Sequence, residues 1–185
     1  MRVSRAQFQE NREKILEAAA RLFRERGFDQ VGVAEVMQAA GLTHGGFYGH
    51  FKSKDDLIAQ ATGEASEPIV ERWGQIVDEQ GEAALKTLAG VYLCEAHLKN
   101  PGSGCIVATL GPEMARQPGA ARAALTRSVQ KLVAIVQRAA PGRTEAEKRR
   151  KALTAYSSWI GALVLARLSD DEAFAKEVLE AVVQG

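Results

Sequence analysis

Two short helical patterns lie close together in residues 33–51, and only the sequence Gly-Leu-Thr of residues 41–43 separates them. Apolar residues recur at helical spacing in the first pattern. Thr43 stands at the N-cap position of a second helix, which we predict from His44 to about Phe51. Two short helices joined by so tight a turn are typical of a helix-turn-helix, which places its second helix in a DNA major groove. No other segment constrains the fold as strongly.

Helical periodicity continues along the chain, and no segment alternates apolar and polar residues convincingly. We predict a long helix from about Phe8 to Arg26, ended by Gly27, and another that begins near Lys54, capped by Ser53. Further helices are predicted over 82–99, 105–117, 119–139, 144–168 and 170–183, with Pro/Gly-rich breaks at 100–104, 117–119 and 139–142. The predicted fold is all-α with about nine helices. A three-helix head in residues 1–52 precedes a larger helical body in residues 53–185.

The composition is that of an ordinary globular protein, with 46% hydrophobic and 25% charged residues and a net charge of +1. Positive and negative charges also nearly cancel in residues 1–60, so DNA binding would depend on a few locally placed groups. No apolar run approaches the roughly 18 residues that span a bilayer, and the N-terminus has no apolar signal core. We therefore expect a cytoplasmic protein with no membrane partner. Cys94 and Cys105 are too few for a disulfide scaffold.

The segment GLTHGGFYGHFKSKDDLI (41–58) resembles the signature of TetR-family repressors, and the resemblance covers residues 8–60. It implies a homodimer that binds palindromic double-stranded DNA. By resemblance, Tyr48, His50 and Lys54 contact phosphates, residues 43–46 face the groove, and Arg5 assists from the N-terminal arm. The full set of candidate DNA contacts is Arg5, Val33, Thr43, His44, Gly45, Gly46, Phe47, Tyr48, His50 and Lys54.

Two features depart from the pattern that this resemblance implies. Gly32 stands where the family usually has Ser or Thr, and Gly46 and Gly49 replace larger residues in the second helix. With Gly45, this short helix holds three glycines, and each costs about 1 kcal/mol relative to Ala. Packing by Phe47 and Phe51 must then hold the helix, and His44 remains as the main side chain for direct base readout.

The larger body is predicted to hold a small effector. Aromatic walls with a few polar groups are usual for a ligand cavity, and the family's architecture places this one among the central helices. Cys105 follows Gly-Ser-Gly and opens a helix, where the helix dipole favours a thiolate. The segment GCIVATLGPEMA (104–115) resembles a TetR subgroup whose members respond to electrophiles, oxidants or aromatic ligands. Cys105 is either such a sensor or a small packing residue. The candidate cavity residues are Trp73, Tyr92, His97, Cys105, Thr109 and Met114.

A second face of large apolar residues follows the helix predicted over 144–168. By resemblance the last two helices pair across a dimer as a four-helix bundle, although the same residues could form intrachain core. The candidate interface residues are Tyr156, Trp159, Ile160, Leu163, Val164 and Arg167.

The sequence is consistent with three functional classes. The leading one is a repressor released by a small aromatic ligand or by an electrophile or oxidant at Cys105. A ligand-independent DNA-binding protein is the second. The third, a small helical enzyme using Cys105 and His97, is disfavoured because the Cys94-x-x-His97 pair lacks a second Cys/His pair for a metal. We therefore expect no enzyme activity, no metal and no cofactor.

Overall fold

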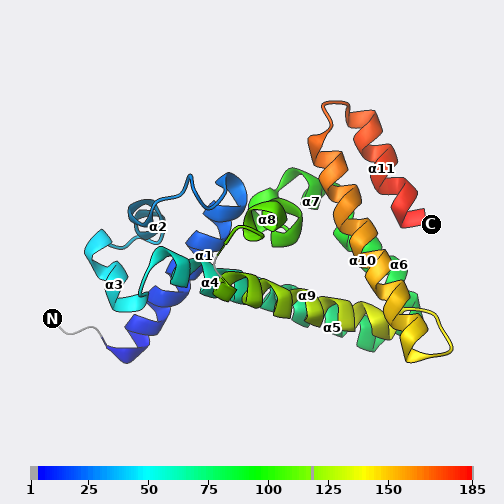
Figure 1. The fold of residues 1–185 in the computed structure, drawn as a ribbon, viewed down its shortest axis with the longest axis horizontal. Helices are drawn as coiled ribbons and strands as arrows, with labels where there is room; N and C mark the ends of the chain where they lie inside the picture. The colour runs from blue at the N-terminus through cyan, green and yellow to red at the C-terminus, as the bar shows by residue number, and fades with distance from the viewer. Residues whose placement is uncertain (1–3, 118, 185) are drawn as a thin grey trace.

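A computed structural model describes residues 4–117 and 119–184, and within these ranges the chain forms helices and no β-strand. The predicted all-α class is confirmed. Figure 1 shows a head at one end of the molecule and a helical hairpin, which carries the C-terminus, at the other. Residue 118, in the predicted break at 117–119, lies outside the described residues.

The head begins with the long helix α1 (Arg5–Arg26), followed by α2 (Val33–Ala39). The Ser4 hydroxyl accepts a hydrogen bond from the backbone N–H of Gln7 at 3.1 Å and so caps α1. Gly27 ends this helix with a φ of 84°, in the left-handed region where a side chain is strained. The predicted end of the first helix at this glycine is confirmed.

The second helix of the helix-turn-helix is shorter than predicted. Instead of one α-helix over 44–51, the chain forms a 3₁₀ turn, η1 (His44–Gly46), and then one α-helical turn, α3 (Phe47–His50). Thr43 stands at the N-cap position, but its side chain makes no capping hydrogen bond. The glycines explain the difference, because they weaken the α-helix relative to other backbone conformations.

The chain enters the body through α4 (Lys54–Glu64), capped as predicted by Ser53, whose hydroxyl accepts from the Asp56 N–H at 3.1 Å. This helix ends at Glu64, and α5 (Glu67–Gln80) follows as a separate element. One apolar core joins α1, α2 and α3 of the head with α4, α8 (Ile106–Met114) and the start of α9 (Gly119–Ala139) of the body. The head is therefore packed directly on the body.

The helix predicted over 82–99 is interrupted. The structure has α6 (Ala84–Tyr92) and a short α7 (Glu95–Lys99), and Cys94 is the extended N-cap residue of α7 rather than a mid-helix residue. The Nδ1 atom of the His97 ring lies 2.6 Å from the Tyr92 carbonyl oxygen. This bond satisfies a carbonyl that the end of α6 would otherwise leave unpaired, which supports the break.

The last two helices, α10 (Glu145–Leu168) and α11 (Glu172–Gln184), form an antiparallel hairpin. Thr144 and Glu147 form a capping box at the start of α10. A second apolar core joins α10 to α5, α6 and α9, with Trp73 and Trp159 in edge-to-face contact at 5.8 Å between ring centroids. Among the described residues, no helix combines the length and apolarity needed to cross a membrane.

Candidate nucleic-acid interface and internal cavity

The turn and the short helix of the helix-turn-helix present one exposed face. Thr43, His44, Gly45 and Gly46 are exposed, and Tyr48 keeps 74% of its surface accessible. The opposite face is fixed in the head core.

Phe47 and Phe51 make that core contact. Phe47 is 1% exposed and stacks on Phe51 with ring centroids 5.7 Å apart. The predicted anchoring role of both residues is confirmed. Phe47 has no side-chain surface to offer DNA, and this corrects its place among the candidate contacts.

Two glycines of this face are not required by the fold. Gly45 and Gly49 have negative φ angles, and a Cβ added at either would meet no atom within 4 Å. Neither backbone strain nor packing within the chain therefore explains the absence of a side chain. Their bare backbone leaves room for a partner to approach closely.

His50 is held by the N-terminal part of α1. Its ring stacks on Phe8 with centroids 4.1 Å apart, and its Nδ1 atom is buried without a hydrogen-bond partner among the described residues. Burial lowers the pKa of His50, and the nearby Arg12 guanidinium lowers it further. At neutral pH His50 is therefore a neutral hydrogen-bonding group.

The remaining candidate DNA contacts lie at the margins of this face. Arg5 is the exposed first residue of α1, and Lys54 is the half-buried first residue of α4. A helix N-terminus with a lysine is a favourable site for a phosphate. Val33, at the start of α2, packs partly against the head core.

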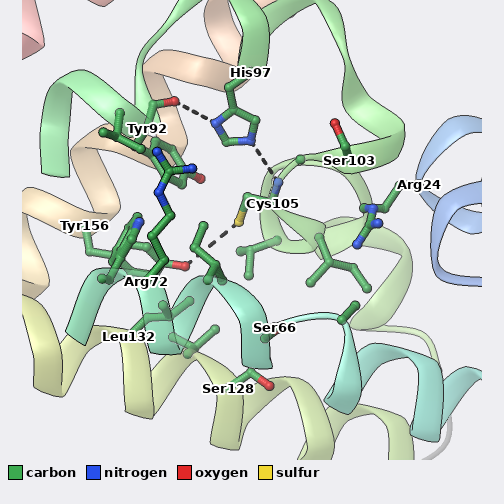
Figure 2. Close-up of a pocket in the computed structure, with 18 of the residues that line it drawn as sticks. Arg24, Ser66, Arg72, Tyr92, His97, Ser103, Cys105, Ser128, Leu132 and Tyr156 are labelled. Carbon is green, nitrogen blue, oxygen red and sulfur yellow. Dashed lines mark hydrogen bonds between the residues drawn. The ribbon is translucent and has the colours of Figure 1, made fainter. Parts of the chain in front are cut away.

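Next to the head, a partly open cavity of about 280 Å³ is lined mainly by residues of the body (Figure 2). Four of the six predicted cavity residues line it, namely Trp73, Tyr92, His97 and Cys105. The other two do not. Met114 is buried in the head core, and the Thr109 hydroxyl donates to the Cys105 carbonyl at 3.0 Å.

Several residues that line the cavity were not among its six predicted residues. Arg24 reaches the wall from α1 of the head, and Arg72, Ser66 and Ser128 reach it from α5, its preceding turn and α9. Tyr156, from α10, also lines it. These residues are far apart in sequence and occupy no motif, so no local signal could have found them.

Cys105 lies at the centre of a small hydrogen-bonded group. Its backbone N–H donates to His97 Nε2 at 2.8 Å, so His97 must carry its proton on Nδ1 and donate it to the Tyr92 carbonyl. The Cys105 Sγ lies 3.9 Å from the Tyr156 hydroxyl. Burial lowers the pKa of His97 and raises that of Tyr156.

Gly104 has a specific reason to precede this cysteine. A Cβ on Gly104 would lie 2.6 Å from Cδ2 of the His97 ring, closer than side chains tolerate. The Gly-Cys pair thus allows the imidazole to reach the Cys105 N–H.

The six residues predicted for a dimer interface are divided by the structure. Tyr156, Trp159 and Leu163 are at most 3% exposed and pack within their own chain, which corrects their placement at an interface. A side chain already buried has no surface left to cover. Arg167 donates to the carbonyl oxygens of His97 at 2.6 Å and Leu98 at 3.3 Å, so it supports α7. Ile160 and Val164 stay partly exposed, and the exposed large apolar residues of the hairpin are instead Leu153, Leu165, Leu168 and Phe174.

The head matches a known family in sequence. Residues 15–61 match the family described as bacterial regulatory proteins, tetR family. A 59-residue stretch is 41% identical to the HTH-type transcriptional regulator AcrR of Shigella flexneri. That stretch is 32% of this chain but only 27% of AcrR, so the chain spans about a quarter of this relative's length in the match.

Two solved structures share the fold over nearly the whole chain. The reduced form of E. coli NemR superposes with a TM-score of 0.80 at 21% identity, over 94% of this chain and 93% of NemR. A TetR transcriptional regulator from Legionella pneumophila gives 0.79 at 18% identity, over 100% of this chain and 98% of that one. The head of this chain therefore matches the tetR-family sequence model over residues 15–61, and the chain as a whole shares the fold of these two solved structures.

Proposed function

We propose that this protein is a homodimeric transcriptional repressor that binds a palindromic duplex and releases it when an effector acts in the body. The observation that carries the proposal is the exposed face of Thr43 to Gly46 and Tyr48, held by a buried Phe47 within a tetR-family head. An exposed helix-turn-helix face of this kind has the geometry that enters a major groove.

In this proposal different residues contact the bases and the phosphates of the DNA. His44 is the principal reader of a base edge, and the bare backbone of the glycines lets the element come close to the duplex. The Tyr48 hydroxyl, His50 and Lys54 bind phosphates, while Arg5 adds a contact from the start of α1. Phosphate contacts fix position and carry no sequence information directly, so specificity depends on His44 and the groove fit.

The dimer is formed by the hairpin of α10 and α11. Leu165, Leu168 and Phe174 are large apolar residues of this hairpin that stay exposed in the single chain, so covering them would favour association. A two-fold pairing of this hairpin would cover them and set the spacing of the two heads. Half-sites about 34 Å apart, one turn of DNA, would then be matched.

The effector site is the cavity that contains Cys105. The segment that precedes its wall residues Ser103 and Gly104, and the helix α8 that follows them, are each bonded to the head, because Arg24 Nε donates to the Gly102 carbonyl at 2.7 Å and the Glu113 carboxylate accepts from the Phe28 N–H at 2.9 Å. A ligand, or modification of Cys105, that favours another arrangement of these contacts would turn the heads out of register.

The two alternatives have weaker support. A ligand-independent DNA-binding protein would have no use for a cavity in contact with its head. For an enzyme, His97 is the only imidazole near Cys105, and its Nε2 already accepts the Cys105 backbone N–H, so it cannot take the thiol proton. Within the described ranges no cluster of three or more His, Cys, Asp or Glu could hold a metal ion.

The proposal is tested by fluorescence anisotropy on the DNA that flanks the protein's own gene. His44→Ala should relax the preference at one base pair per half-site, and Lys54→Ala should weaken all sequences alike and lower the salt slope by about 1 per protomer. Lys86→Ala, an exposed lysine on α6, is the matched control and should change nothing. Equal behaviour of all three variants would contradict the proposal.

The sensor role of Cys105 has its own test. A quinone or hypochlorite should release DNA from the wild-type protein and fail to release it from Cys105→Ser. If both proteins lose DNA equally, the reagent acts elsewhere and Cys105 is not the sensor.

A further inference from the structure

The cavity that contains Cys105 has an uneven charge. Arg24 and Arg72 line it, on either side of Cys105 in Figure 2, and none of the described residues in its wall is Asp or Glu. Neither arginine forms an ion pair with any other described residue. Arg24 is partly buried, and a cation withdrawn from water is unfavourable unless an opposite charge accompanies it, whereas Arg72 is exposed and adds positive charge at the wall. The wall is therefore electrostatically complementary to an anion.

Arg24 is positioned to bind an anion. Its Nε atom is occupied by the Gly102 carbonyl, and no described residue accepts a hydrogen bond from its two terminal nitrogens. The side chain is partly buried, and this burial lowers its pKa. A guanidinium with one edge anchored keeps planar donors for a carboxylate, which it can bind through two parallel hydrogen bonds.

The rest of the wall favours an aromatic ring. Trp73, Tyr92 and Tyr156 contribute aromatic surface, and the Trp73 indole N–H and the Tyr92 hydroxyl are buried without a hydrogen-bond partner among the described residues. Buried donors of this kind normally find an acceptor. The volume of about 280 Å³ lies just below the usual range for ligand pockets, roughly 300–1,000 Å³, and so suits a small ligand of one or two rings.

We propose that the effector is a small aromatic acid whose carboxylate binds Arg24, with Arg72 as a second counter-charge and the ring against the aromatic wall. The inference rests on the proposed function, because it takes this cavity as the effector site. It also explains how the signal reaches DNA. Arg24 belongs to α1 of the head, so the ligand's charge contacts the DNA-binding unit directly.

Isothermal titration calorimetry with 4-hydroxybenzoate and its uncharged isostere 4-hydroxybenzamide tests the charge preference. The acid should bind the wild-type protein at least about 10-fold more tightly, as charge-assisted hydrogen bonds imply. Arg24→Gln and Arg72→Gln should each reduce this preference, and the double variant should abolish it. Arg122→Gln, an exposed arginine on α9 outside the cavity wall, should retain it.

Equal binding of acid and amide by the wild-type protein, or an unchanged preference in both cavity variants, would overturn the inference. Arg72 is exposed, so Arg72→Gln remains informative even if Arg24→Gln disturbs the packing of α1. The same preparations are assayed for sequence-specific DNA binding. Specific DNA binding without an acid preference refutes the ligand class alone, whereas absence of specific DNA binding refutes the proposed function.

Discussion

Gly49→Ala should make the protein more stable and worse at binding DNA. The added Cβ would meet no atom within 4 Å, and the backbone angle is not in the left-handed region, so the substitution adds no strain or clash. Alanine is favoured over glycine in a helix by about 1 kcal/mol, and the gain should be somewhat smaller in so short a helix as α3. For a domain of this size a gain near 1 kcal/mol raises Tm by about 2–4 °C.

The same methyl group projects from the exposed face of the helix-turn-helix. If the duplex approaches the α3 backbone as proposed, the methyl group must displace it, and DNA affinity should fall by about 10-fold, equivalent to ~1.4 kcal/mol. Gly74→Ala, inside α5 and also free of contacts within 4 Å, is the matched control. It should raise Tm similarly and leave DNA affinity unchanged. Thermal unfolding and anisotropy on the same samples measure both effects. Wild-type DNA affinity in Gly49→Ala would refute the close approach.

Three further predictions concern the body and its contacts. Glu113→Ala should lower the free energy of unfolding by about 1–2 kcal/mol in urea titrations, because the Phe28 N–H loses its carboxylate acceptor. Glu113→Gln keeps an oxygen acceptor and should retain most of the wild-type stability. The His97 ring is buried beside Tyr92, Cys105 and Arg167, and this burial lowers its pKa in the folded protein. As the pH falls, the imidazole of the unfolded chain therefore takes up a proton before that of the folded chain does. The free energy of unfolding should therefore fall as pH drops below about 6.5, more steeply in wild type than in His97→Asn, as urea titrations at several pH values would show. Leu165→Glu should weaken dimerisation by at least about 30-fold in analytical ultracentrifugation, since an unpaired charge in an interface costs roughly 2 kcal/mol or more, whereas Thr126→Glu on the exposed side of α9 should not.

The head could be predicted closely because its signals are local. Gly27, Gly41 and Ser53 act on their immediate neighbours, and the structure places a helix boundary at or beside each of them. The length of the α-helix in the second part of the motif is less predictable from the sequence. Glycine is unfavourable in an α-helix, but this preference alone does not specify a 3₁₀ turn followed by a single α-turn that begins at the buried Phe47.

The body is less predictable from the sequence because its structure depends on contacts between different helices. The break between α6 and α7 depends on the His97 ring reaching back to the Tyr92 carbonyl, and periodicity alone does not reveal this. Tyr156 and Trp159 have the same spacing whether they face a partner or their own core, and the structure assigns them to the core. Arg24 enters the cavity from another region of the chain, which only the packing of α1 against the body determines.

Selection of bound duplexes from a random DNA pool tests the central claim most directly. A repressor of the proposed type should enrich one palindrome, with half-sites about one helical turn apart, and prefer it to unrelated DNA by roughly 10³-fold or more. The His44→Ala protein, selected in parallel, should enrich a sequence relaxed at one symmetric base pair. A pool that remains random after repeated rounds, with affinity that depends on salt alone, would contradict sequence-specific recognition by this helix-turn-helix.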